Sequence, residues 1–138
     1  MLNQFTTSAT SKATYTIGAF GVAGCDYNFA SAANANEQSI QLGATTIIPA
    51  LSPVFRMTTV CLDGLNGAIT GTSDVGLTSG SAEYMSAVNV DDTNEIAVMT
   101  VNVVPQLAAS SIYFSFTPNA NWNTITNGKW TTTIYFLV

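Results

Sequence analysis

The densest group of residues that could do chemistry is the acidic stretch NVDDTNE, which contains Asp91, Asp92 and Glu95. Two carboxylates can act as acid and base in glycosidic hydrolysis. Asp91, Asp92 and Asn94 also offer the hard oxygen ligands that calcium prefers, although EF-hand spacing is not met. Asp-Asp-Thr-Asn between two candidate strands is typical of a polar hairpin turn. The pattern favours a turn, with a calcium site as the alternative.

The other usual catalytic groups are scarce. The sequence has no histidine, which excludes Ser-His-Asp and Cys-His nucleophilic sites and almost every zinc site with imidazole ligands. Its two cysteines, Cys25 and Cys61, cannot form a structural zinc centre alone. The glycine-rich GAFGVAG lacks the Lys-Ser/Thr of a phosphate-binding loop. We therefore predict no catalytic, cofactor-binding or metal-binding residue, and a protein that is not an enzyme.

Two aromatic residues are the candidates for exposed binding positions. Trp122 lies in the Asn-rich loop NANWN, and Tyr27 is the second candidate. Exposed Trp and Tyr serve both carbohydrate stacking and protein interfaces. The alternative for Trp122 is that it folds back over one end of the domain. Replacing Trp122 by alanine is expected to leave the fold intact. Trp130 opens a strand and is predicted to be structural.

Charge limits the partners. Three basic residues, Lys12, Arg56 and Lys129, stand against eight acidic ones, and charged residues make up 8% of the chain, compared with roughly a quarter in a typical domain. Three scattered cations cannot form the basic stripe that nucleic acids require. No run approaches the roughly 18 to 20 apolar residues of a membrane-spanning helix. The expected partners are proteins or sugars.

The elements expected to carry these residues are β-strands. In SIYFSF and KWTTTIYFLV, apolar side chains alternate with polar ones, and β-branched and aromatic residues dominate. Similar segments recur between Gly, Asn, Asp and Pro turns. We therefore predict an all-β fold: a single β-sandwich domain over residues 1–138, jelly-roll-like, with about eight antiparallel strands. Alternation alone does not give the strand order. The expected strands are 14–22, 38–42, 54–62, 71–77, 83–90, 95–104, 111–116 and 129–138.

Both ends of the chain raise questions about assembly. Residues 1–12 include the polar tract 6–12, which is expected to be either a loose arm or an arm that clasps a neighbouring subunit. The N-terminus lacks the pattern of a secretory signal, so we expect synthesis in a cytoplasm and two reduced thiols, with a Cys25–Cys61 disulfide as the alternative. The last strand ends on an apolar run that would usually fray in a monomer. Its interface candidates are Ile134, Phe136, Leu137 and Val138.

Three stretches carry a resemblance to a known group: LGATTIIPALSPVFRMTTVCL, GAITGTSDVGLTSGSAEYMSAVNV and FSFTPNANWNTITNGKWTTTIYFLV. Together they resemble small tailed-phage virion β-sandwich proteins, over roughly residues 38 to 138. The resemblance does not extend to residues 1–37 or to the cysteine pair.

This resemblance implies a non-enzymatic structural component of a bacteriophage particle, most simply a capsid decoration or cement protein. The alternative is a tail- or fibre-associated module that binds a receptor or carbohydrate. The implied partners are further copies of the chain, often as a trimer, and the major capsid or tail proteins of the same virion. Burial of the terminal strand between subunits, or its addition to a neighbouring subunit's sheet, would explain its apolar end. Interface cores are also depleted in charge.

Overall fold

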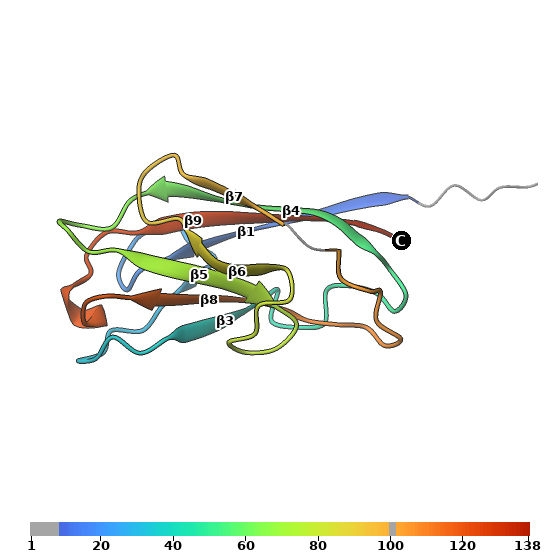
Figure 1. Cartoon of the computed structure of the whole chain (residues 1–138), viewed down its shortest axis with the longest axis horizontal. Coiled ribbons are helices and arrows are strands. Elements are labelled where there is room, and N and C mark those ends of the chain that lie inside the picture. Colours follow the sequence, from blue (N-terminus) through green and yellow to red (C-terminus); the bar gives the residue numbers. More distant parts are fainter. Residues whose placement is uncertain (1–8, 100–101) are drawn as a thin grey trace, which may run out of the picture.

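The computed structural model describes residues 9–99 and 102–138 as two packed β-sheets (Figure 1). The first sheet has five strands in the order β2-β1-β9-β4-β7, and the second has four in the order β3-β8-β5-β6. The strands are β1 (Thr10–Gly18), β2 (Tyr27–Asn28), β3 (Gln38–Leu42), β4 (Val54–Asp63), β5 (Gly71–Gly76), β6 (Met85–Asn89), β7 (Ile96–Val98), β8 (Ile112–Pro118) and β9 (Lys129–Leu137). A single 3-10 turn, η1 (Trp122–Thr124), precedes β9.

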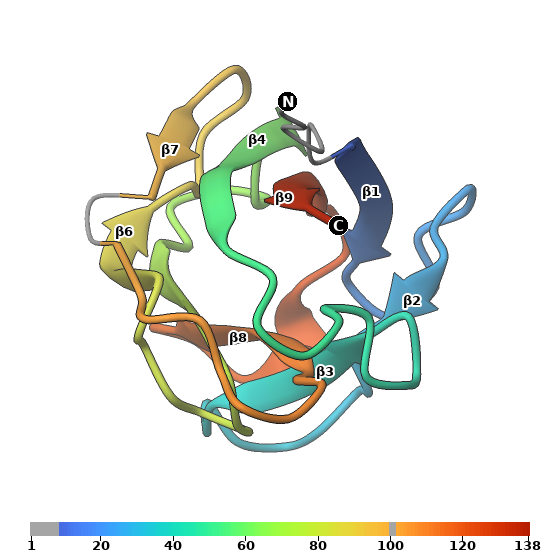
Figure 2. The ribbon, with the colours of Figure 1, turned by 90° about the vertical axis from the view of Figure 1, so that its right-hand side faces the viewer.

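The strand order is that of a jelly roll. Apart from the two-residue β2, which pairs in parallel with β1, all neighbouring strands are antiparallel. The remaining orders, β1-β9-β4-β7 and β3-β8-β5-β6, place successive strands in alternate sheets except for the β5–β6 pair. This interleaving is the double Greek key of a jelly roll. Figure 2 shows the two sheets end-on, with β9 between β1 and β4. The predicted all-β sandwich is confirmed.

The last strand lies inside its sheet. β9 pairs along its whole length with β1, from Thr10↔Leu137 to Gly18↔Lys129, and its other edge pairs with β4. Its side chains alternate between half-buried and buried from Lys129 to Leu137, as the period-two pattern predicts. A strand with both edges occupied has no free edge for another subunit, so the idea that it completes a neighbour's sheet is wrong.

The predicted N-terminal arm, residues 1–12, falls partly within this sheet. Residues 10–12 belong to β1 and pair with the end of β9, and the Val138 backbone N–H donates to the Ala9 carbonyl at 2.9 Å. Residues 1–8 lie outside the described residues. Residues 10–12 are therefore not part of a loose arm, because they have strand partners.

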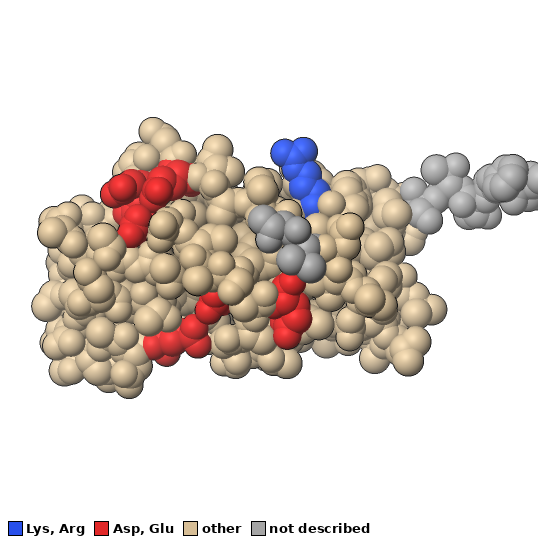
Figure 3. Space-filling view, in the orientation of Figure 1, with Lys and Arg blue, Asp and Glu red and all other residues tan. Residues whose placement is uncertain are grey.

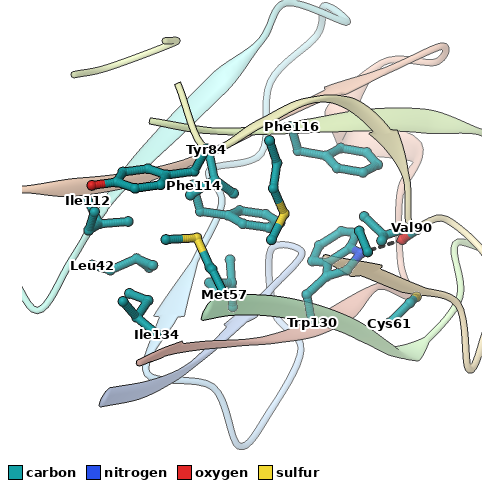
Figure 4. Packing of buried hydrophobic residues seen from close by; sticks show 14 of the residues in the cluster. Leu42, Met57, Cys61, Tyr84, Val90, Ile112, Phe114, Phe116, Trp130 and Ile134 are labelled. Carbon is teal, nitrogen blue, oxygen red and sulfur yellow. Dashed lines mark hydrogen bonds between the residues drawn. The ribbon is translucent and has the colours of Figure 1, made fainter. Parts of the chain in front are cut away.

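The core between the sheets is rich in aromatic rings. Trp130 is fully buried, its ring centroid lies 4.8 Å from that of Phe116, and its indole N–H donates to the Val90 carbonyl at 2.5 Å (Figure 4). The ring centroid of Phe29 lies 6.1 Å from those of both Phe114 and Trp130. Partnered indole N–H groups let large rings be buried without leaving an orphan donor. The structural role predicted for Trp130 agrees with this packing.

Several boundaries differ from the sequence-based expectation. In the part of the segment 95–104 that the structure describes, which leaves out residues 100 and 101, the strand is the short β7. In GAFGVAG, a side chain at Gly18 would collide with the Cys25 sulfur, while Gly21 and Gly24 have positive φ angles of 79° and 77°.

In the described residues the structure has no helix with the length and apolarity for crossing a membrane.

Candidate interaction surface

The acidic stretch forms the turn between β6 and β7. The Glu95 carboxylate accepts backbone N–H groups of Asp91 and Asp92 at 3.0 and 2.7 Å, and Asn94 takes a positive φ of 73°. The Asp91 carboxylate accepts the Gly71 N–H at 3.0 Å. Ligating oxygens of Asp91, Asp92 and Glu95 all lie within 4.8 Å of one another, but their hydrogen bonds are those of a turn. The geometry supports the predicted turn.

One pocket of about 230 Å³ opens next to this turn, on the outer side of β5 and β8. It contains a single carboxylate, from Asp91, together with hydroxyl and amide side chains. A lone carboxylate that already accepts a backbone N–H lacks the second acid that glycosidic hydrolysis requires. The pocket therefore offers hydrogen bonding rather than acid–base chemistry. Its lining residues are Thr70, Gly71, Thr72, Asn89, Asp91, Thr117, Pro118 and Asn119.

Both cysteines are free in the structure. Cys61 is fully buried on β4, and its thiol donates to the Asp63 carbonyl at 3.3 Å. Burial, reinforced by the negative charges of Glu95 and Asp91, raises its pKa to about 12. Burial also raises the pKa of the half-buried Cys25 thiol. Because the thiolate is the nucleophile, neither position is a reactive site.

The raised pKa of Cys61 predicts a loss of stability in alkali. The thiol ionises near pH 9 in the unfolded chain and near 12 in the folded protein, so the unfolded state releases its proton first. The free energy of unfolding should therefore fall as pH rises from about 9 towards 12. Denaturant titrations at pH 8, 9 and 10 test this, with Cys61→Ala expected to show a shallower decline over that range. An equal decline in both proteins would contradict the assignment to Cys61.

Trp122 is not exposed, contrary to the expectation for a binding residue. It is 1% exposed, its ring centroid lies 4.8 Å from that of Phe29, and its indole N–H donates to the Asn36 carbonyl at 2.7 Å. The η1 turn directs the ring inward to close one end of the core, which was the alternative for this residue. Tyr27 is half-buried on β2, and its ring lies 6.3 Å from that of Tyr15. Neither residue forms an exposed aromatic platform.

The four interface candidates of the last strand separate into two pairs. Ile134 and Phe136 are buried in the core of their own chain, at 0% and 8% exposure, so they are not available to a partner. Their side chains point between the two sheets because β9 is a central strand. Leu137 is half-buried and Val138 is 53% exposed. Only these two remain as candidates for contact with another chain.

Val138 belongs to a larger apolar surface that the sequence did not predict. The loops 43–53 and 102–111 lie together at this end of the sandwich (Figure 2), and the Leu51 N–H donates to the Gln106 carbonyl at 2.7 Å. Neither loop contains a charged residue. We call this surface the apolar end; its exposed side chains are Leu51 (63%), Val104 (76%), Leu107 (89%) and Val138 (53%).

Figure 3 shows the same end, at the right, free of acidic and basic side chains on the face in view. Exposed apolar residues that gather where charge is missing are typical of protein interaction sites. The sequence signal for this surface was the absence of charge from two adjacent turn-rich loops, which period-two analysis does not detect.

Two phage capsid chains share this fold. A chain of the cyanophage Pam1 capsid asymmetric unit is 14% identical with a TM-score of 0.63, and the alignment covers 100% of this chain and 91% of that one. A chain of the Ralstonia phage GP4 capsid is 18% identical with a TM-score of 0.58, covering 100% and 90%. No protein-family model and no curated protein matches the sequence. At such identities the likeness establishes the fold alone.

Proposed function

We propose that this protein is a non-enzymatic structural component of a bacteriophage particle, most simply a capsid decoration or cement protein. The observation that carries the proposal is the apolar end, which exposes four large apolar side chains on loops without charge. Such a surface needs a protein partner to remove it from water. The fold, shared over nearly the full length with chains from two phage capsids, makes a capsid protein the best-supported partner.

The chemistry of the chain agrees with a structural role. The sequence has no histidine, the buried thiol holds its proton, and the clustered carboxylates fix a turn. The apolar loops would be buried on the capsid lattice.

The alternative, a tail- or fibre-associated module that binds carbohydrate, has less support. Its proposed aromatic residue, Trp122, is buried, and no aromatic residue lines the polar pocket beside Asp91. A tail location is distinguished by experiment, since the purified protein would then bind isolated tails rather than capsids.

The docking role predicts the effect of charge placed on the apolar end. Leu51→Asp with Leu107→Asp should keep the fold, because both side chains are at least 63% exposed. Binding to capsids of the parent phage assembled without this protein should weaken at least about tenfold, which corresponds to about 1.4 kcal/mol. Co-sedimentation with these capsids measures the affinity.

The control is Phe20→Asp, which places one aspartate on a 60% exposed side chain beyond the opposite end of β1. It should bind like the unmodified protein. Capsid binding that is equally strong in the double variant would refute docking through the apolar end. Binding of the unmodified protein to tails alone would replace the decoration role with the tail-associated one.

Self-association, with a trimer as the expected form, is part of the proposal. Assembly into symmetric homo-oligomers is common among soluble proteins. Light scattering gives the subunit number as the ratio of the measured mass to the 14.5 kDa of one chain.

A further inference from the structure

The basic residues of the chain lie on one side of the sandwich. Lys12 and Arg56 are the strand neighbours of Tyr135 from β1 and β4, so all three project from the outer face of the five-stranded sheet. Lys129 lies on the same face at the far end of β9. In the described residues neither Lys12 nor Arg56 has a carboxylate oxygen within 4.0 Å.

Around Tyr135 these cations form a surface with the composition of an interface. The Arg56 guanidinium lies 5.5 Å from the centre of the Tyr135 ring, and the 46% exposed Phe55 ring lies 6.2 Å from it. Tyr, Phe and Arg are the residues enriched at protein interfaces, where Tyr and Arg often dominate the binding energy. We call Lys12, Phe55, Arg56 and Tyr135 the basic patch.

The opposite side of the sandwich carries a pair of carboxylates. Asp74 projects from β5 beside Ser115, and Glu37 accepts a hydrogen bond from the Thr117 hydroxyl at 3.4 Å, on the outer face of the four-stranded sheet. Burial raises the pKa of Glu37, and the charge of Asp74 and a hydrogen bond to it raise this pKa further. The negative charge of Asp74 disfavours ionisation of Glu37, and a cation bound from outside would relieve this repulsion. We call Glu37 and Asp74 the acidic patch.

We propose that the basic patch of one copy of this chain binds the acidic patch of a second copy. Charge complementarity supports this partner, because Lys12 and Arg56 lie on one outer face and Glu37 and Asp74 lie on the other. Figure 3 shows a basic side chain projecting above β4 and acidic side chains over the four-stranded sheet, with a further acidic group beside β7. The contact joins two different surfaces that lie on opposite outer faces, so repetition generates an open chain rather than a two-fold dimer or the closed trimer expected above.

This inference rests on the proposed self-association and specifies its two faces, but it is independent of capsid docking through the apolar end. Exposed ion pairs contribute little alone. The aromatic pair at the centre of the basic patch supplies the apolar area, and the charges set which face it meets.

The test reverses the sign of the charges in the basic patch and then in both patches. Lys12→Glu with Arg56→Glu makes both outer faces acidic and should reduce the light-scattering mass of the oligomer to that of one chain, 14.5 kDa. Adding Glu37→Lys and Asp74→Lys to the same chain makes the faces complementary again and should restore the original mass. Lys129→Glu is the matched control, because it changes the charge on the same sheet away from the patch and should leave the mass unchanged.

A second measurement needs no substitution. Raising the salt concentration from about 50 mM to about 1 M shortens the screening length from more than 10 Å to about 3 Å and should dissociate the oligomer at a fixed protein concentration. This result decides the question if a reversed variant does not fold, which its thermal melt would show.

A mass of one chain for the unmodified protein at every concentration would overturn the inference. So would an oligomer that withstands both reversal and salt. Co-sedimentation of the same samples with capsids reports docking separately: reversed chains that are monomeric but still bind capsids support the two-patch contact, and intact oligomers that do not bind would refute the docking role alone.

Discussion

A chain truncated after Thr133 is expected to show no cooperative unfolding transition. The deletion of residues 134–138 removes the pairing of β9 with residues 10–13 of β1 and with the start of β4 in one step. It also removes Ile134 and Phe136, which are 0% and 8% exposed. Truncating either side chain to alanine costs about 2–5 kcal/mol, and the stability of a whole domain is only about 5–15 kcal/mol. Circular dichroism during heating measures the loss.

Removal of Val138 alone is the control for this deletion. It leaves β9, which ends at Leu137, and removes a half-exposed side chain and one backbone hydrogen bond to Ala9. This variant should melt within a few degrees of the unmodified protein. A five-residue truncation that still melts cooperatively near the same temperature would show that β1 and β4 do not depend on β9.

Trp122→Ala should destabilise the fold by about 3–5 kcal/mol, the usual cost of deleting a large buried aromatic side chain. This reverses the expectation from the sequence, where Trp122 in an Asn-rich loop suggested exposure. The substitution opens a cavity beside Phe29 and Phe116 and leaves the Asn36 carbonyl without its donor. The melting temperature should fall by about 10 °C or more.

Asn123→Ala is the control from the same turn. The Asn123 side chain is exposed, and the residue donates its backbone N–H to the Ala32 carbonyl, a bond that alanine keeps. Its replacement should therefore change the free energy of unfolding by no more than about 0.5 kcal/mol. Trp122→Phe keeps a ring in the core, so its melting temperature should lie between those of Trp122→Ala and Asn123→Ala. Equal melting temperatures for Trp122→Ala and Asn123→Ala would place the Trp122 ring outside the core.

The contrast between Trp122 and Trp130 shows how far the sequence could predict this structure. Trp130 lies in a long alternating segment, where the period of two assigns each side chain to a face. Trp122 lies in a loop, and nothing local specifies that a 3-10 turn directs it onto Phe29. Its burial depends on residues far away in the sequence that the fold brings into contact.

The same distinction, between local alternation and contacts made by the fold, applies to the candidate interaction surface. The alternation of β9 predicted that Ile134 and Phe136 share a face, but not that their partners are within the chain, because strand pairing is not encoded in alternation. The apolar end depends on Leu51 and Leu107 coming from two connections that meet only through the jelly-roll topology. The low content of charged residues was visible in the sequence, whereas the grouping of uncharged, apolar loops at one end of the sandwich was not.

The position of β9 also has a consequence for how the protein is made. Synthesis proceeds from the N-terminus, so β1 and β4, strands of 9 and 10 residues, emerge from the ribosome before the strand that joins them. Until residues 129–137 are free, each keeps an open edge that can pair with another nascent chain. Folding of this sheet must therefore follow translation of the last strand, and crowded polysomes or fast expression should favour aggregation over the native sandwich.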